Sequence, residues 1–301
     1  TAYSSDGLSG LGDEAITVSE SITVAQANTL DALTSGVVTA TISDNDIASL
    51  DTLTGTGNAY TISVSDASVT AAGLNTLDGK TTVAVDLSSA TTVTGSVSDI
   101  DTAYSSDGLS GLGDEAITVD SGTASVAEVN DLADLTTGTL TATVTEGDMA
   151  TLAGITESGN ALTVTVTDTS VAADALNTLD GLTTVAVDLS SATTVTGSVS
   201  DIDTAYSSDG LSGLGDEAIT VSESITVAQA NTLDALTSGV VTATISDNDI
   251  ASLDTLTGTG NAYTISVSDA SVTAAGLNTL DGKTTVAVDL SSATTVTGSV
   301  S

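Results

Sequence analysis

The chain contains no cysteine, histidine, proline, tryptophan or phenylalanine, and aromatic residues make up 2% of its 301 residues. Without cysteine and histidine it has no thiol nucleophile, no Ser-His or Cys-His pair, and none of the usual sulfur or nitrogen ligands of zinc. Without large rings, the core has to be filled by Val, Ile, Leu and Ala, which suits a core that is one or two side chains thick. The sequence also has no run of 18 apolar residues, so no segment is predicted to span a membrane.

Positive charge is nearly absent, because two lysines oppose forty acidic residues and the net charge is -38. Such a chain repels both the phosphates of nucleic acids and anionic membrane surfaces, so we expect neither as a partner. Charged residues are nevertheless only 14% of the chain and hydrophobic residues 40%, in regular patterns. This composition predicts a folded chain rather than a disordered one.

The chain is built from long sequence repeats. The phrase TAYSSDGLSGLGDEAITV begins at Thr1, Thr102 and Thr204, and residues 204–301 reproduce residues 1–98 without a change. The long repeats are therefore 1–101, 102–203 and 204–301, in the order A-B-A with the last one incomplete. We expect residues 1–301 to form one continuous stack, and to be a segment of a longer periodic array.

Shorter units recur inside each long repeat. An Asn-Thr-Leu-Asp box occurs at Asn28–Asp31 and again 47 residues later at Asn75–Asp78, which predicts coils of about 22 to 25 residues. Alternate apolar positions of one coil keep their character between repeats, since Tyr60, Ile62 and Val64 become Leu162, Val164 and Val166. The residues between them stay Ser or Thr. This period of two predicts strands with an aliphatic inner face and a hydroxyl outer face.

Short helices are predicted after the strands. Ser43-Asp44 and Ser65-Asp66 have the residue types of helix N-caps, and the helices that follow are predicted to end at Gly55 and Gly79. The stretch from Thr82 to Glu115 departs from this scheme. There VAVDL and ATTVTGSVSDI predict two strands, and YSSDGLSGLGDE predicts a loop that projects from the stack.

These patterns predict a right-handed β-solenoid of parallel strands with short helical turns. Tandem Ig-like β-sandwich domains are the alternative, because about 100 residues is the size of one such domain. The Asn-Thr-Leu-Asp box favours the solenoid, since a sandwich does not need one phrase repeated within the domain.

Acidic residues of the enlarged coil are candidate calcium ligands, because Ca²⁺ takes six to eight oxygen ligands. They are Asp99, Asp101, Asp107, Asp114 and Glu115, repeated as Asp201, Asp203, Asp209, Asp216 and Glu217. The alternative is a solvated turn-forming loop, since the spacing differs from that of an EF-hand. Asp31, Asp51 and Asp78 are expected to form a column of like charges about 5 Å apart, which salt or divalent cations would stabilise.

Catalysis is not predicted. Lys80 and Lys283 are equivalent positions at which the B repeat has Leu182, so these lysines are expected to face solvent. Paired carboxylates could hydrolyse glycosides, yet an active-site cleft normally breaks repeat symmetry and the acidic segments recur unchanged. A polysaccharide-active enzyme is therefore kept only as a minor alternative.

Two phrases, ITVAQANTLDALTSGVVTATISDND and TTVAVDLSSATTVTGSVSDI, resemble repeat regions of very large, acidic, cysteine-free secreted bacterial surface and matrix proteins, which are grouped with RTX-like adhesins. The resemblance covers the whole chain and implies an extracellular or cell-surface scaffold. The sequence thus predicts a self-associating structural component of a fibre, filament or sheath. An adhesin stalk, or a module that binds glycan or ice through its outward Thr and Ser rows, is the alternative.

Overall fold

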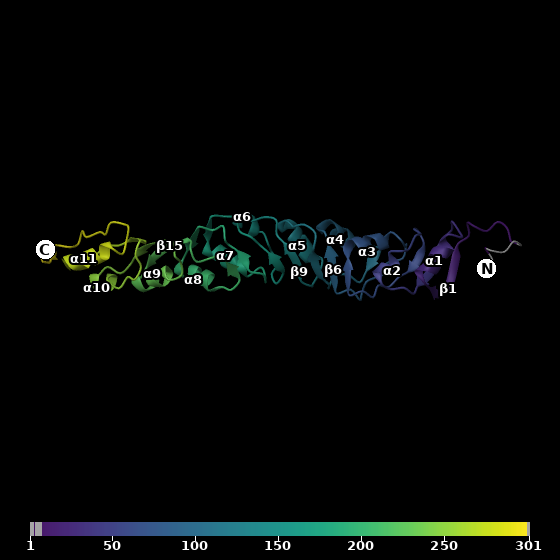
Figure 1. Ribbon diagram of the computed structural model, residues 1–301, viewed down its shortest axis with the longest axis horizontal. Coiled ribbons are helices and arrows are strands. Elements are labelled where there is room, and N and C mark those ends of the chain that lie inside the picture. Colours follow the sequence, from purple (N-terminus) through teal and green to yellow (C-terminus); the bar gives the residue numbers. More distant parts are fainter. Residues whose placement is uncertain (1–2, 4–7, 300–301) are drawn as a thin grey trace. The chain divides into compact units, whose positions relative to one another are not determined.

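The computed structural model describes residue 3 and residues 8–299 of the chain (Figure 1). The described residues form two compact units: unit 1 runs to Thr145 and includes Asn160–Leu162, and unit 2 comprises Glu146–Gly159 and the chain from Thr163 onward. Both units have an α/β fold in which short strands and short helices alternate along the chain. The described helices have four to nine residues, and none is long and apolar enough to cross a membrane.

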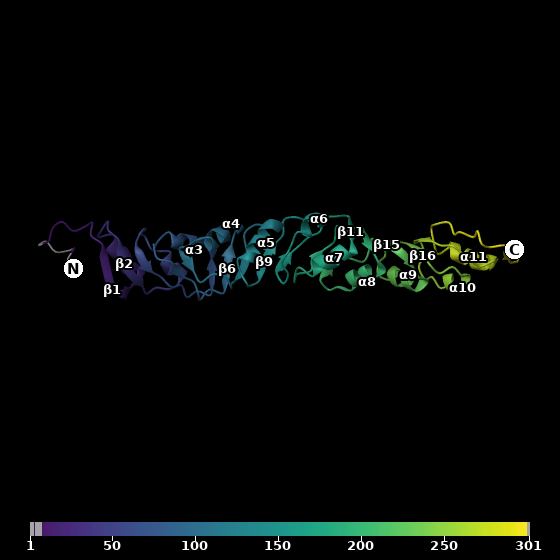
Figure 2. The same cartoon turned by 180° about the vertical axis from the view of Figure 1, so that it is seen from behind.

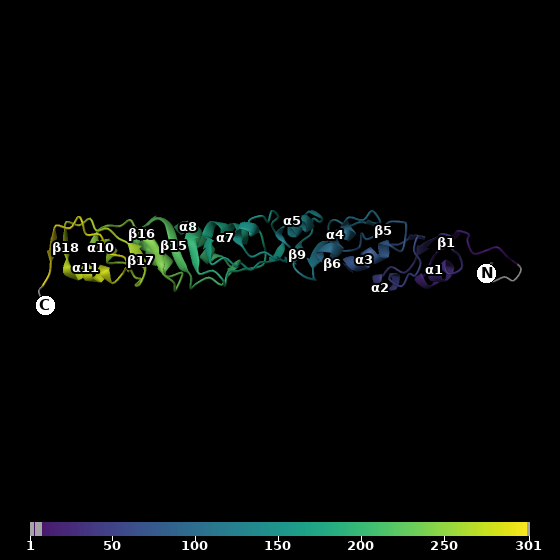
Figure 3. The ribbon, with the colours of Figure 1, turned by 90° about the horizontal axis from the view of Figure 1, so that it is seen from above.

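Unit 1 begins with two strand–helix pairs and continues with pairs of strands that alternate with helices. Its strands are β1 (Ile16–Ile22), β2 (Val38–Ile42), β3 (Ala59–Thr61), β4 (Ser68–Thr70), β5 (Val85–Asp86), β6 (Thr92–Gly95), β7 (Leu109–Ser110), β8 (Ala116–Val119), β9 (Leu140–Thr143) and the start of β10 (Ala161–Thr163). Its helices are α1 (Val24–Asp31), α2 (Ile47–Leu50), α3 (Ala71–Asp78), α4 (Val97–Tyr104) and α5 (Val126–Asp134). Helix α3 packs against α4, and α4 against α5 (Figure 3).

Unit 2 contains the same kinds of elements but begins with a helix. Its strands are β11 (Ser170–Ala172), β12 (Val187–Asp188), β13 (Thr194–Gly197), β14 (Leu211–Ser212), β15 (Ala218–Ile225), β16 (Val241–Ile245), β17 (Ala262–Thr264), β18 (Ser271–Thr273) and β19 (Thr295–Thr297). Its helices are α6 (Met149–Leu152), α7 (Ala173–Asp180), α8 (Val199–Ser207), α9 (Val227–Asp234), α10 (Ile250–Leu253) and α11 (Ala274–Asp281). Helix α7 packs against α8 (Figure 2).

Twelve strand pairs of the described residues are parallel and join residues 20 to 24 positions apart, as Thr39 with Ala59 and Ser68 with Thr92. The larger sheets have the open orders β1-β2-β3, β10-β9-β8-β6-β4 and β11-β13-β15-β16-β17, so these strands close no barrel. Parallel pairing at this spacing confirms the predicted parallel strands. The Ig-like alternative is wrong, because an Ig sandwich is built from antiparallel sheets.

The alternation read from the sequence separates the core from the surface. Tyr60, Ile62 and Val64 are buried, with 0%, 1% and 3% of their surface exposed, whereas Thr61 and Ser63 between them are exposed. Leu162, Val164 and Val166 are buried at the equivalent positions. The aliphatic side chains therefore fill an inner layer and the hydroxyl side chains cover the outer face, as predicted.

The helices begin with local caps. The hydroxyl of Thr70 accepts the N–H of Gly73 at the start of α3, and the carboxylate of Asp46 accepts the N–H of Ser49 at the start of α2. Helix α3 ends at Asp78 with Gly79 as its C-cap, as predicted, but α2 ends at Leu50 and not near Gly55.

A carboxylate from further along the chain reaches the start of five helices. Oδ2 of Asp44 accepts the N–H of Val24, the first residue of α1, at 2.7 Å, so Asp44 serves a helix that lies 20 residues before it. The same bond joins Ile47 to Asp66, Met149 to Asp168, Val227 to Asp247 and Ile250 to Asp269. We call these bonds the inter-turn caps. The prediction that Asp44 and Asp66 cap the helices following them is therefore wrong.

The enlarged coil also differs from its prediction. The segment predicted as one strand contains β6, followed by the helix α4, because Ser96 accepts the N–H of Asp99 as an N-cap and the helix buries Ile100 and Ala103. The loop after α4 does not project. Leu109 pairs in parallel with Val85, with 9% of its surface exposed, which holds the loop against the preceding turn.

The local cap of α6 gives a prediction for pH dependence. Hydrogen bonds from the hydroxyl and then the N–H of Thr151 lower the pKa of Asp148. A carboxylate whose pKa is lower in the folded state stabilises the fold above its unfolded pKa of about 3.9, and the contribution is lost as the pH falls through the folded pKa. Asp148→Asn keeps a capping oxygen without the charge. The midpoint of thermal unfolding should be higher for the native chain than for this variant at neutral pH. The difference between the two midpoints should vanish in acid.

Asp107→Asn is the matched control, because it removes one negative charge from an exposed residue that is outside any helix. The difference between its unfolding midpoint and that of the native chain measures only the effect of removing one negative charge from a highly acidic chain. A pH dependence of Asp148→Asn identical to that of Asp107→Asn would contradict the prediction.

Candidate functional site

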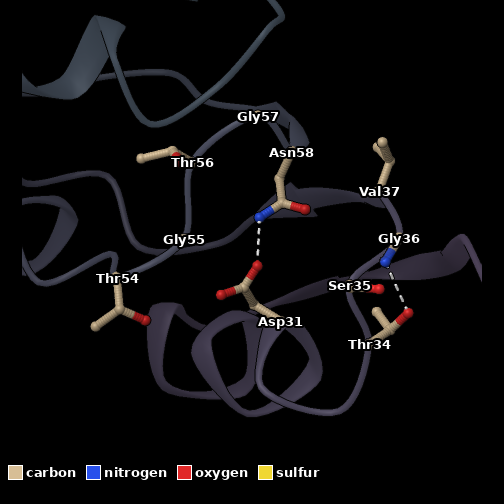
Figure 4. A pocket seen from close by; sticks show the side chains of 10 residues that line it. All are labelled: Asp31, Thr34, Ser35, Gly36, Val37, Thr54, Gly55, Thr56, Gly57 and Asn58. Carbon is tan, nitrogen blue, oxygen red and sulfur yellow. Dashed lines mark hydrogen bonds between the residues drawn. The ribbon is translucent and has the colours of Figure 1, made fainter. Parts of the chain in front are cut away.

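A polar pocket lies where α1 and the segment before β3 meet (Figure 4). Its volume is about 370 Å³, and hydroxyl, amide, carboxylate and backbone groups line it. The lining residues are Asp31, Thr34, Ser35, Gly36, Val37, Thr54, Gly55, Thr56, Gly57 and Asn58. The side chains of Asp31 and Asn58 point toward one another across it.

Asn58 joins three segments of the chain and is 2% exposed. Its Oδ1 accepts the N–H of Val38 at the start of β2 at 2.8 Å, and its Nδ2 donates to Oδ1 of Asp31 at 2.7 Å. The third repeat forms the same pair of bonds at Asn261, with Val241 and Asp234. A buried amide with its acceptor and donor both used fixes the position of α1 relative to the next turn, since an unsatisfied buried polar group costs about 1–3 kcal/mol.

The B repeat arranges the equivalent place differently. Asn160 is retained and accepts the N–H of Leu140 at 2.9 Å. The position of Asp31 is taken by Ala133, and that of Gly55 by Glu157. In the A repeat a Cβ on Gly55 would lie 2.6 Å from Oδ1 of Asp31 and from Nδ2 of Asn58, so a side chain there would require Asp31 and Asn58 to shift. The B repeat thus lacks the carboxylate that binds the amide of Asn58 in the A repeats.

Tyr60 lies next to this pocket in the core. Burial raises its pKa to about 12, and the negative charge of Asp31 adds to the shift. Its hydroxyl is buried and has no hydrogen-bond partner. Tyr60 is therefore a packing residue, as its replacement by Leu162 in the B repeat predicts.

The polar groups of the pocket form hydrogen bonds within the chain. Asp31 is the single carboxylate among the lining residues, whereas glycoside hydrolysis uses two. Thr34 is 9% exposed, and its hydroxyl donates to the carbonyl of Glu14 and accepts the N–H of Gly36. The hydrogen bonds of Thr34 and Asp31 therefore position the segments of the chain that surround the pocket.

The candidate calcium ligands are dispersed and not gathered around one point. Asp99 and Asp201 accept from Ser96 and Ser198 within the caps of α4 and α8. Glu115 and Glu217 are 1% exposed, and the remaining ones, Asp101, Asp107, Asp114, Asp203, Asp209 and Asp216, are exposed. In the part of the chain that the structure describes, no three Asp or Glu side chains come together as a metal site. A calcium ion needs six to eight oxygens at once, and calcium binding at these residues stays a prediction.

Glu115 instead forms a buried pair with Tyr104. Oε2 of Glu115 accepts the Tyr104 hydroxyl at 3.0 Å and the N–H of Gly113 at 2.8 Å, while Oε1 is buried and has no partner. Burial raises the pKa of Tyr104, and the charge of Glu115 adds to this effect. Tyr206 and Glu217 repeat the pair in unit 2.

The expected column of like charges is interrupted by hydrogen-bond donors. Asp31 accepts from Asn58, and Oδ2 of Asp78 accepts the hydroxyl of Ser106 at 2.9 Å, while Asp51 is the C-cap residue of α2. Asp31 and Asp78 are thus each bound by a residue that follows later in the chain. These hydrogen bonds offset the repulsion between the carboxylates without a cation.

Sequence reasoning missed Asn58 and the pairing of Tyr104 with Glu115. A signal for Asn58 existed, because Asn58, Asn160 and Asn261 are the same residue in all three repeats while Gly55 changes to Glu157. The partners of Glu115 carry no local signal, since Tyr104 lies eleven residues before it.

Comparison with known proteins finds no match: no family model, no curated protein and no solved structure is similar to the chain.

The buried pair predicts different outcomes for one substitution at two tyrosines. Tyr104→Phe removes a donor from a buried carboxylate and should destabilise its turn by about 1–3 kcal/mol. Tyr60→Phe removes a buried hydroxyl that has no partner and should leave stability unchanged or raise it. Hydrogen exchange of the amides around β7 and β3 in the two variants measures each effect locally. Equal loss of protection in both variants would contradict the role of the pair.

The dispersed carboxylates give a prediction for calcium. Thermal unfolding of the whole chain should have the same midpoint with and without a chelator, because no described group of carboxylates can surround the ion. The expectation would be contradicted by an unfolding midpoint that rises with added calcium and saturates, while magnesium at equal concentration leaves it unchanged. Such a result would indicate a calcium site.

Proposed function

We propose that the chain is a structural component of an extracellular or cell-surface fibre, filament or sheath. Its parallel strands form a right-handed solenoid in which each turn of the chain lies on the one before. The fibre grows by stacking and association of such arrays. The sequence predicts a scaffold, and the parallel strands are compatible with a solenoid.

The inter-turn caps are the observation that carries the proposal. In each of five places a carboxylate accepts the first N–H of a helix from the preceding turn, at 2.6 to 2.7 Å. Asn58 and Asn261 add a second set of bonds between successive turns. Polar groups that hold turns together are what a scaffold requires, because the stability of a repeat array comes largely from contacts between neighbours.

A binding face is the second candidate, and one observation favours it. Thr70, Thr94, Thr118 and Thr141 lie in register on neighbouring parallel strands of unit 1. The same row in unit 2 runs through Thr196, Thr220 and Thr242. A row of hydroxyls repeating at the strand spacing of about 4.8 Å could match a regular surface such as a glycan or ice, which suits an adhesin stalk.

Salt concentration is expected to control association. With a net charge of -38, two chains repel one another at low ionic strength, and the repulsion reaches over a Debye length of about 10 Å at 0.1 M salt but only about 3 Å at 1 M. Sideways association should therefore require salt or multivalent cations.

Negative-stain electron microscopy of the native protein tests the proposal. We expect long filaments of uniform width, single in dilute salt and bundled in concentrated salt. The low-salt sample serves as the control for bundling. Dispersed particles that carry a distinct head at every salt concentration would overturn the fibre and favour the adhesin stalk.

A further inference from the structure

An apolar groove lies between α6 and α7 in unit 2. Its volume is about 180 Å³, and its floor is made by Leu152 and Leu179, which are 0% and 3% exposed. Met149, Ala153 and Leu182 form the walls, where Met149 and Leu182 are partly exposed and Ala153 is exposed. Met149 is the one methionine of the chain, and its flexible thioether side chain adapts to differently shaped ligands.

The apolar walls belong to the B repeat alone. Where the B repeat has Met149, Ala153 and Leu182, the first A repeat has Ile47, Asp51 and Lys80, and the third repeat has Ile250, Asp254 and Lys283. The A repeats thus place one carboxylate and one ammonium group at walls that are wholly apolar in the B repeat. Because one charge of each sign is lost, the difference leaves the net charge of the repeat unchanged.

The groove is flanked by negative charge. Asp148 immediately precedes Met149 and Asp174 immediately precedes Ala175, a further lining residue, and both carboxylates are on exposed residues. Asp174 is itself particular to the B repeat, since the first A repeat has Ala72 there. The hydrogen bonds that Asp148 and Asp174 accept use Oδ1, which leaves Oδ2 for a ligand. No Lys or Arg occurs between Lys80 and Lys283 to balance these charges.

We propose that this groove is a docking site for a short cationic amphipathic helix of another protein. Aliphatic side chains of that helix enter the groove between α6 and α7, and its Lys or Arg side chains face Asp148 and Asp174. An apolar groove with a charged rim is a common receptor for such helices. A second copy of this chain is disfavoured as the occupant, because none of its described helices carries a Lys or Arg to face Asp148 and Asp174. The site is independent of filament formation.

A synthetic helix of Leu and Lys, with the leucines on one face, is the probe. Isothermal titration calorimetry of the native chain at about 0.15 M salt should give saturable binding of one peptide per chain. The triple variant Met149→Ile, Ala153→Asp, Leu182→Lys carries the residues that the A repeats already hold at these positions, so its fold is retained and its net charge stays at -38. We expect its affinity to fall at least about tenfold.

The reciprocal variant tests the same groove by gain of binding. Ile47→Met, Asp51→Ala, Ala72→Asp and Lys80→Leu transfer the B walls and the carboxylate of Asp174 to the first repeat, change the net charge only from -38 to -39, and should raise the stoichiometry to two peptides per chain. A peptide of identical composition with its leucines scattered around the helix is the control for binding to the acidic surface in general. Three results would each overturn the proposal: unchanged affinity in the first triple variant, equal binding of the scattered peptide, or no saturable binding by the native chain.

Discussion

The carboxylate that caps a helix of the preceding turn is the interaction on which the rest of this structure depends. Helices of four to nine residues are marginal in isolation, because forming the first turn is costly and few bonds follow it. Asp44 supplies an acceptor to the first N–H of α1, and it places a negative charge at the positive end of the helix dipole. A helix in one turn is thus completed by the strand end of the next turn, so local structure and the contact between turns form together.

This arrangement gives the acidity of the chain a structural use. Asp31 and Asp78 bind an amide and a hydroxyl of the following turn, and Asp46 and Asp148 bind N–H groups at helix starts. Backbone and side-chain donors take the place that lysine and arginine would hold in a chain of balanced charge. A structure held in this way can carry forty acidic residues with two lysines and still pack an aliphatic core.

The sequence predicts the parts of this structure that are periodic over a few residues. The buried positions Tyr60, Ile62 and Val64 follow from alternation, and the end of α3 follows from Gly79. The partner of Asp44 could not be predicted from a local window, because it lies 20 residues earlier. Helix α4 was missed because its Val, Ile and Thr residues have low helix propensity, which the burial of Ile100 and Ala103 outweighs. The acidic residues were expected to gather, yet Glu115 is separated from the others by its burial against Tyr104.

The exchange of Asp31 and Gly55 for Ala133 and Glu157 constrains how such an array can evolve. Replacing Gly55 first would place a Cβ against the carboxylate of Asp31, and replacing Asp31 first would leave Nδ2 of Asn58 without its acceptor. The two positions are 24 residues apart, yet each change alters the surroundings of the same Asn58 amide. Selection on one turn is in this way tied to the sequence of the next, which favours copying of long blocks over gradual drift. The identity of residues 204–301 with residues 1–98 is the kind of record that such block copying leaves.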